Sequence, residues 1–175
     1  MEKIKRVAII GSPGSGKTTL SHKIEKIYNL PVFNIDTIYQ LPNWVMNDPQ
    51  KRDAQIIEET NKEEWIIDGT FIDTLEERVK RADKIIFLDY STFAFLKGIF
   101  KRLFEDYGKE KEDMPGCKEK FDLSFIFYVA TYNIRRRKYI VEILNKYPEK
   151  DIMYFKRQKD LNKWIEKLEN EKLNY

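Results

Sequence analysis

A glycine-rich stretch near the N-terminus carries the clearest chemistry in this sequence. Residues 11–18 read Gly-Ser-Pro-Gly-Ser-Gly-Lys-Thr, which satisfies the G-x-x-x-x-G-K-[ST] pattern of a phosphate-binding loop (P-loop). Glycines at these positions let the backbone wrap around phosphate, and the following helix presents the positive end of its dipole to the same anion. Such a match arises by chance in a chain of this length with a probability of about 1%. The sequence therefore predicts a nucleoside triphosphate site.

The polar residues of this loop have distinct expected roles. Lys17 adds a full positive charge beside the β- and γ-phosphates, and the Thr18 hydroxyl is the expected Mg²⁺ ligand. The residues predicted to contact the nucleotide are Gly11, Ser12, Gly14, Ser15, Gly16, Lys17, Thr18 and Thr19. ATP and Mg²⁺ are the expected cofactors.

Three classes of protein use such a loop, and two of them lack their usual residues here. A GTPase needs Asn-Lys-x-Asp, but the three Asn-Lys pairs, at 61–62, 145–146 and 162–163, have Glu64, Pro148 and Ile165 in the fourth place. A motor-type ATPase has an apolar strand ending in Asp-Glu, whereas Asp68 and Asp89 are followed by glycine and tyrosine. A small-molecule kinase needs neither feature, because its second substrate supplies the nucleophile.

A kinase does need carboxylates at the ends of strands that face the phosphates. Asp36 and Asp68 each follow a short apolar run, and ligands sit at the carboxyl ends of parallel strands. Asp68 precedes Gly69 and is expected to hold Mg²⁺ through water. Asp36 is expected to orient or deprotonate the acceptor, although it could instead cap the next helix. Asp89 is assigned as a helix cap.

The elements that must position these residues alternate along the chain. Continuous apolar runs, typical of strands buried on both faces, occur at 6–10, 32–35, 65–68, 84–89 and 152–155. Amphipathic stretches between and after them predict helices at 17–28, 49–61, 74–81, 92–107, 121–147 and 159–172. This alternation predicts a single α/β domain over residues 1–175, a three-layer fold with a five-stranded parallel sheet and helices on both faces.

One region is longer than a simple crossover requires. About sixty residues separate the fourth and fifth predicted strands, and their middle, 108–120, is charged and contains Pro115 and Gly116. Cations flank this polar loop, namely Lys101 and Arg102 before it and residues 135–138 (Arg-Arg-Arg-Lys) after it. Two helices joined by the loop could form a movable helical lid over about residues 101–138. Solvated helix surfaces are the alternative.

The amino-acid composition excludes further classes of protein. The 175 residues include 32 Lys+Arg against 29 Asp+Glu, giving a formal charge of +3, and 14% are aromatic, as expected of a folded chain. One cysteine and one histidine exclude a disulfide framework and a cysteine- or histidine-rich metal site. No apolar run approaches the roughly 18 residues of a membrane span, and the four-residue apolar run at 7–10 is too short for a signal-peptide core, so a cytoplasmic location is expected.

Several segments together resemble a known family. They are the P-loop, Val32-Phe-Asn-Ile-Asp36, Trp65-Ile-Ile-Asp68-Gly69-Thr70, Arg78…Ala82-Asp83…Ile86-Phe-Leu-Asp89 and Met114-Pro-Gly-Cys-Lys-Glu-Lys-Phe-Asp122. In this combination they resemble the adenylate-kinase-related family labelled DNA topology modulation protein, over nearly the whole chain. The resemblance implies a nucleoside-monophosphate-kinase fold, an acceptor region after the second strand and a lid between the fourth and fifth.

The resemblance also implies roles for individual residues. Asp68-Gly69 matches the strand-end pair that serves the Mg²⁺ water shell in adenylate kinases. Those enzymes continue with Phe-Pro-Arg, whereas this chain has Thr70-Phe-Ile, so Arg78 is the expected substitute for the arginine that grips the acceptor. Arg102 matches the arginine at the start of the lid, and residues 135–137 match those at its end. Arg102, Arg136 and Arg137 are therefore expected to neutralise migrating charge.

The function predicted from these residues is an ATP- and Mg²⁺-dependent phosphotransferase acting on a small acceptor of nucleotide or nucleoside-like kind. Its predicted catalytic residues are Lys17, Asp36, Asp68, Arg102, Arg136 and Arg137, with acceptor binding by Asp36 and Arg78 and metal binding by Thr18 and Asp68. The alternative is a nucleotide-binding regulator that associates with DNA through residues 135–138, although four cations make a small footprint. A homodimer stays open as an assembly state.

Overall fold

A five-stranded parallel sheet forms the centre of the molecule. The computed structural model describes residues 4–111 and 114–173. The strands are β1 (Arg6–Gly11), β2 (Val32–Asn34), β5 (Trp65–Asp68), β6 (Lys84–Leu88) and β9 (Asp151–Phe155). They are ordered β2-β5-β1-β6-β9, and all four neighbouring pairs are parallel. The predicted α/β fold and its five strands are confirmed.

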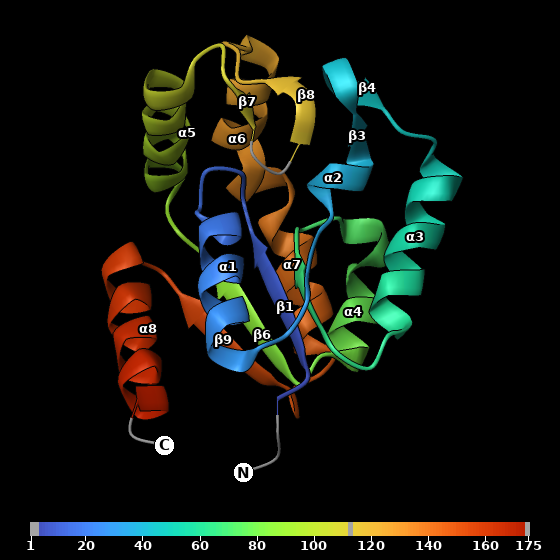
Figure 1. Ribbon diagram of the computed structural model, residues 1–175, viewed down its shortest axis with the longest axis vertical. Helices are drawn as coiled ribbons and strands as arrows, with labels where there is room; N and C mark the ends of the chain where they lie inside the picture. Colours follow the sequence, from blue (N-terminus) through green and yellow to red (C-terminus); the bar gives the residue numbers. More distant parts are fainter. Residues whose placement is uncertain (1–3, 112–113, 174–175) are drawn as a thin grey trace.

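Helices cover both faces of this sheet. They are α1 (Lys17–Tyr28), α2 (Asp36–Tyr39), α3 (Pro49–Asn61), α4 (Leu75–Arg81), α5 (Thr92–Asp106), α6 (Leu123–Arg135), α7 (Arg137–Asn145) and α8 (Gln158–Leu173), with short 3-10 turns η1 (Pro42–Trp44) and η2 (Ile72–Thr74). Helix α1 contacts α8, and α4 contacts α7. Figure 1 shows α1 in front of the sheet and α7 behind it. Among the described residues, no helix is long and apolar enough to cross a membrane.

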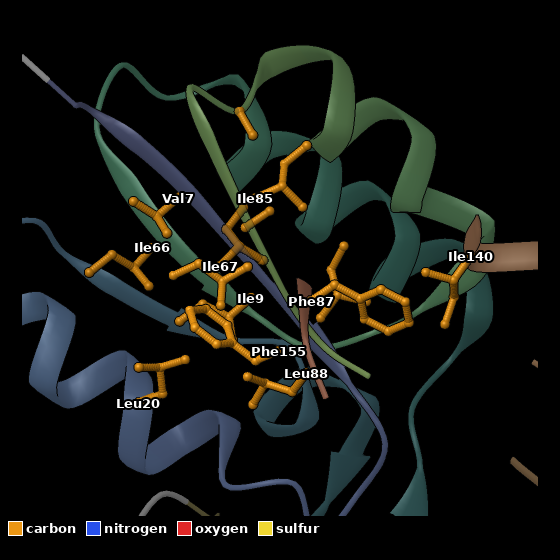
Figure 2. Close-up of a cluster of buried hydrophobic side chains, with 14 of the residues drawn as sticks. Val7, Ile9, Leu20, Ile66, Ile67, Ile85, Phe87, Leu88, Ile140 and Phe155 are labelled. Carbon is orange, nitrogen blue, oxygen red and sulfur yellow. The ribbon is translucent and has the colours of Figure 1, made fainter. Parts of the chain in front are cut away.

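The core explains why the strand sequences are continuous apolar runs. Residues 7–10 of β1 and Ile85 and Ile86 of β6 are completely buried. Figure 2 shows these strands crossing a cluster that also includes Leu20 of α1 and Ile140 of α7, so both faces of the sheet are covered. Because the central strands have no solvent-facing side, no alternation of polar residues is needed.

Two predicted helical features differ in the structure. The single helix expected over 121–147 is two helices, which meet at Arg136 with φ −112° and ψ −38°. Asp89 was expected to cap the helix after the fourth strand, but Ser91 caps α5 by accepting a hydrogen bond from the Ala94 amide. Asp89 instead binds Arg137, as described below. The spacing of apolar residues could not reveal either change, since both depend on contacts between distant elements.

Two small antiparallel hairpins stand above the carboxyl ends of the strands. One joins β3 (Gln40–Leu41) to β4 (Val45–Met46), between α2 and α3, and we call it the acceptor hairpin. The other joins β7 (Glu110–Lys111) to β8 (Met114–Lys118), between α5 and α6, and we call it the lid hairpin. Figure 1 shows both at the same end of the molecule. Neither hairpin was predicted, because strands of two to five residues leave little periodic signal.

The helices of the predicted lid are largely fixed to the core. Phe95 and Ile99 of α5 and Val129 and Tyr132 of α6 belong to the central apolar cluster, with exposed fractions of 3% or less. Helices packed in this way do not swing as a flap without breaking the core. Any movable part of the lid is therefore confined to its outer end, near the lid hairpin.

Candidate phosphate and acceptor cleft

A cleft of about 1500 Å³ opens at the carboxyl ends of the strands. At one end lie the P-loop, α5 and the start of α8, and at the other lie α2, the acceptor hairpin and α3. Asp122, Phe125, Tyr128 and Arg136 line it from the α6 side. The cleft therefore brings together segments from nearly the whole sequence, as the rule for ligand sites in parallel sheets predicts.

The P-loop connects β1 to α1 at the bottom of the cleft. Gly14 and Gly16 have positive φ angles, 79° and 84°, a conformation that side chains with a Cβ rarely adopt. Helix α1 begins at Lys17 with neither a side-chain cap nor an acidic residue in its first turn. Its N-terminal amides and positive dipole end are therefore available to an anion.

Helix α5 supports the P-loop from outside through a close backbone contact. A Cβ placed on Gly98 would lie 2.1 Å from the Gly14 carbonyl oxygen, and one placed on Gly14 would lie 2.4 Å from the Phe95 carbonyl oxygen. Only a helix without a side chain at position 98 can approach so closely. Sequence reasoning overlooked Gly98, whose signal was a glycine in the middle of an otherwise regular helix.

Thr70 holds the first residue of the P-loop. Its hydroxyl accepts a hydrogen bond from the Gly11 amide at 2.8 Å and donates one to the Gly11 carbonyl at 2.7 Å. Both backbone groups at the end of β1 are thus satisfied by one side chain from the segment after β5. The Asp68-Gly69-Thr70 sequence therefore secures the loop as well as supplying a carboxylate.

The predicted metal ligands Thr18 and Asp68 lie together. The Thr18 hydroxyl donates to Asp68 Oδ2 at 2.8 Å, and Asp68 is 1% exposed. Asp68 pairs in register with Ile9 of β1, so the sheet itself fixes the carboxylate beside the loop. A hydroxyl and one carboxylate, all oxygen donors, fit Mg²⁺, which keeps several waters and takes further oxygens from phosphates. No group of three metal-ligating side chains occurs among the residues described.

Lys17, the predicted phosphate-binding lysine, is half-buried at the start of α1. Its Nζ lies 3.3 Å from the Ser12 carbonyl oxygen, across the loop. The ammonium group therefore already spans the loop, and it lies on the wall of the cleft. An anionic ligand bound in the loop would lie close to the positive charge of Lys17.

Arg78 does not occupy the acceptor-binding position that the resemblance implied. It is fully buried, and it donates to the Gly69 and Phe71 carbonyl oxygens, each at 2.5 Å. Burial lowers its pKa to about 9, although the charge of Asp68 opposes that shift. Arg78 is not among the residues that line the cleft. It instead holds the backbone of residues 69–71 beneath Thr70, which corrects the prediction.

Arg52, overlooked in the sequence, occupies the acceptor end of the cleft. Its guanidinium lies 4.5 Å from the centre of the Tyr39 ring and 4.3 Å from that of Phe71, and the residue is only 7% exposed. Its Nε donates to Asp53 at 3.3 Å. Asp36 lines the same end, exposed at the start of α2. The signal in the sequence was an arginine four residues before Ile56, on the buried face of α3.

The arginines of the predicted lid separate into different environments. Arg136 is exposed and lines the cleft, as predicted for a phosphate-binding cation. Arg137 points elsewhere: it binds both carboxylate oxygens of Asp89 at 2.7 Å, and this raises its pKa. It is not among the cleft residues. The predicted role of Arg137 at the phosphates is therefore corrected, since its guanidinium already binds Asp89 through two nitrogens.

Arg102 lies on the cleft wall next to a buried carboxylate. Its NH2 donates to Glu119 Oε1 at 3.2 Å, and its Nε lies 3.1 Å from Oε2. The Glu119 side chain is 6% exposed and comes from the segment after β8. Arg102 is thus positioned by the lid hairpin region, although part of its charge is balanced there.

The two hairpins touch each other across the open side of the cleft. Trp44 Nε1 donates to the Lys118 carbonyl at 3.0 Å, and Cys117 Sγ lies 3.5 Å from the Leu41 carbonyl oxygen. A Cβ placed on Gly116 would lie 2.8 Å from Pro42 Cβ. The acceptor hairpin and the lid hairpin therefore close over the cleft together.

Buried tyrosines complete the wall between the two ends. Tyr90 and Tyr132 both line the cleft, and burial raises the pKa of each hydroxyl, so both are neutral at physiological pH. Tyr132 packs edge-to-face against Phe95 and Tyr128. These groups exclude water and add no charge near the phosphates.

Comparison with known proteins gives the fold a precedent. No protein-family model matches the sequence, and no curated relative matches it. The Acinetobacter baumannii shikimate kinase in complex with shikimate matches with a TM-score of 0.59 and 14% identity, over 95% of this chain and 93% of that one. The M. mycoides deoxyadenosine kinase with bound dATP gives 0.54 and 19%, over 97% and 100%.

A gluconokinase from Sinorhizobium meliloti gives a TM-score of 0.51 and 13% identity, over 99% of this chain and 92% of that one. At such low identities the likeness establishes the fold, which is that of P-loop kinases of small molecules. The expected likeness to nucleoside-monophosphate kinases is thus supported at the level of the fold. The DNA topology modulation label is not confirmed.

Proposed function

We propose that this protein is an ATP- and Mg²⁺-dependent phosphotransferase that moves the γ-phosphoryl group of ATP to a small acceptor. One observation carries the proposal: a single cleft holds the P-loop with its Thr18–Asp68 pair at one end, and Asp36 with Arg52 at the other. Further support comes from the three structural neighbours, each named as a kinase of a small molecule.

In the proposed mechanism, the chain mainly positions and neutralises. The loop amides and Lys17 hold the β- and γ-phosphates, while Thr18 and Asp68 would hold Mg²⁺. Bound Mg²⁺ supplies charge neutralisation at these phosphates. Arg136 and Arg102 add positive charge where the phosphoryl group migrates, and both line the cleft. Asp36 accepts the proton of the acceptor's attacking group.

The acceptor end also suggests what kind of molecule enters. Arg52 presents a buried cation, and its guanidinium packs against the rings of Tyr39 and Phe71, which contact each other edge-to-face. Such a group suits a phosphate or carboxylate, because a rigid fork loses little entropy when it binds an anion. Tyr39, Phe71 and Tyr128 line the surrounding wall and offer surfaces to a flat ring. We therefore favour an anionic acceptor of nucleotide or nucleoside-like size.

The alternative role at DNA receives little support from the placement of the four cations. Arg136 lines the cleft, Arg137 binds Asp89, and the guanidinium of Arg135 lies 5.5 Å from the centre of the Phe127 ring. Lys138 lies 3.7 Å from Glu142. These side chains do not form one basic surface, whereas binding to a phosphate backbone needs several cations in line.

An acceptor screen followed by kinetics tests the proposal. Thermal shift of the full chain with Mg²⁺ and a non-hydrolysable ATP analogue identifies nucleotides and anionic metabolites that stabilise it. Each hit is then assayed for acceptor-dependent ATP consumption, with the phosphorylated product identified by mass spectrometry. Lys17→Ala should lower turnover at least about a hundredfold, because a charge at the transition state is lost. Lys26→Ala, an exposed lysine on the same helix, is the matched control.

Two outcomes would contradict the proposal. One is wild-type turnover in Lys17→Ala with a true acceptor. The other is salt-sensitive binding to DNA with no acceptor-dependent ATP consumption across the screen.

A further inference from the structure

An exposed apolar stripe runs along the outer side of α5. Phe100, Phe104 and Tyr107 follow one another at spacings of four and three residues, with Tyr107 directly after the helix, and Phe104 is 92% exposed. The opposite side of the helix, with Phe95 and Ile99, is buried in the core. Much of the surface of these aromatic residues therefore stays in contact with water in a single chain, which is costly.

Helix α6 carries a second stripe of the same kind. Leu123, Phe127 and Ile134 lie on its outer side, and Leu123 and Ile134 are 70% and 81% exposed. Val129 and Tyr132, on the other side, are buried. Each of the two lid helices thus has one apolar face in the core and another in solvent.

The two stripes lie beside each other. Helices α5 and α6 pack against one another, and Asn133 of α6 donates to the Tyr90 carbonyl at 3.1 Å and to the Thr92 hydroxyl at 3.3 Å. Viewed down the axis of each helix, the exposed stripe lies next to the side that faces the other helix, and it is displaced from that side in the same rotational sense on both helices. Because the chain reverses direction between the helices, the stripes flank one seam. We call the six residues of both stripes the α5–α6 face.

The size of the α5–α6 face fits a protein interface. With about 200 Å² for a fully exposed large residue, its six members expose on the order of 800 Å². The largest apolar patch on a typical monomer is about 300–600 Å², and a standard interface buries about 800 Å² on each partner. A face of this area is therefore large enough for a stable dimer.

The charges around the face favour a protein over a polyanion or a lipid surface. Lys101 lies 3.9 Å from Glu105, Lys109 lies 3.1 Å from Asp106, and Lys138 lies 3.7 Å from Glu142. These three cations near the face thus lie close to an acid on the same helix or next to it, and the Arg135 guanidinium lies 5.5 Å from the centre of the Phe127 ring. An anionic membrane or a nucleic acid would require an excess of positive charge there.

We propose that the α5–α6 face is the interface of a homodimer, in which two antiparallel helix pairs meet around a two-fold axis as a four-helix layer. A second copy supplies a surface of the same area and the same apolar character, as an isologous interface requires. The small formal charge of +3 opposes the approach of two copies only weakly. This interface does not depend on the proposed catalytic function.

Molar mass measured by light scattering after size exclusion, across a range of concentrations, tests the proposal on the full chain. We expect the wild type to have the mass of two 21.1 kDa chains. Phe104→Glu and Ile134→Glu should each weaken association at least about a hundredfold, because they bury carboxylates at the two-fold interface without partners. Val45→Glu, an equally polar change at an exposed site on the acceptor hairpin, should leave the dimer intact.

Hydrogen exchange on the wild type provides a test without mutations. Amides of 100–107 and 123–134 should become more protected as the concentration rises, while those of α8 should not change. A wild-type chain that is monomeric at every concentration would overturn the proposal. So would a dimer that survives both glutamate variants, or a monomer that binds anionic vesicles through this face.

Discussion

The two ends of the cleft are built from different parts of the chain. At the nucleotide end, the P-loop and the ends of β1 and β5 are joined by bonds that involve the central sheet, such as those from Thr70 to Gly11. At the acceptor end, the walls are mostly side chains on short elements, with Asp36 on a four-residue helix and Arg52 packed against the rings of Tyr39 and Phe71. In the proposed reaction, the phosphates are therefore held by a rigid frame, whereas the acceptor is held by side chains whose positions depend on one another.

The largest expected effect separates the two ends directly. Asp68→Asn should lower turnover at least about a hundredfold and weaken its dependence on Mg²⁺, because the carboxyl group that would hold Mg²⁺ beside the Thr18 hydroxyl is lost. Metal-free nucleotide binding and the KM for the acceptor should change little. Steady-state kinetics across Mg²⁺ concentrations, together with calorimetric nucleotide binding, provide the measurement.

At the acceptor end, a smaller effect with the opposite pattern is expected. Arg52→Gln should raise the KM for the acceptor about 10- to 150-fold, the effect of losing one charge-assisted hydrogen bond of about 1.5–3 kcal/mol. Asp36→Asn should also affect acceptor use, through proton transfer. Lys51→Gln, on the exposed neighbour of Arg52, is the control. If these variants and Asp68→Asn all impair only ATP affinity, the two ends do not have separate roles.

Arg136 and Arg137 are adjacent in the sequence, and separate substitutions test whether one acts in turnover and the other in stability. Arg136→Gln should lower turnover about tenfold or more with no loss of thermal stability, because its side chain is exposed in the cleft. Arg137→Gln should instead lower the free energy of unfolding by about 1–3 kcal/mol, because it leaves the buried Asp89 carboxylate without its partner. Paired kinetics and denaturant unfolding would contradict this division if both variants showed one shared defect.

The smallest expected effect concerns the contact between the hairpins. Trp44→Phe keeps an aromatic ring but loses the bond to Lys118, worth about 0.5–1.5 kcal/mol, so proteolysis within 108–120 should increase several-fold. An ATP analogue with acceptor should protect this segment in the wild type. Trp65→Phe is the matched control, since its indole donates to Thr60 in the core. If the rate of cleavage within 108–120 changes neither with ligand nor with Trp44→Phe, the hairpins do not close together.

The contrast between the ends also explains what the sequence could predict. The P-loop, Asp68 and the five strands were predictable because glycine spacing and apolar runs express local requirements of the backbone. Arg52 and Arg78 were not, because their roles depend on which residues the fold brings around each guanidinium. The adjacent positions of Arg136 and Arg137 suggested one function, but a change of helix between them directs their side chains to different partners.

Gly98 links these parts of the molecule. A glycine inside a helix costs about 1 kcal/mol relative to alanine, yet here a single added methyl group would collide with the Gly14 carbonyl oxygen. The helix is therefore less stable by itself, but its backbone can lie in direct contact with the backbone of the P-loop. A chain that replaced this glycine would have to push α5 outward, and Arg102 and the outer aromatic stripe would move with it. The contact at position 98 thus fixes the distance between the phosphate loop and α5. A mutation that changes this distance affects both the loop and the far surface of the helix.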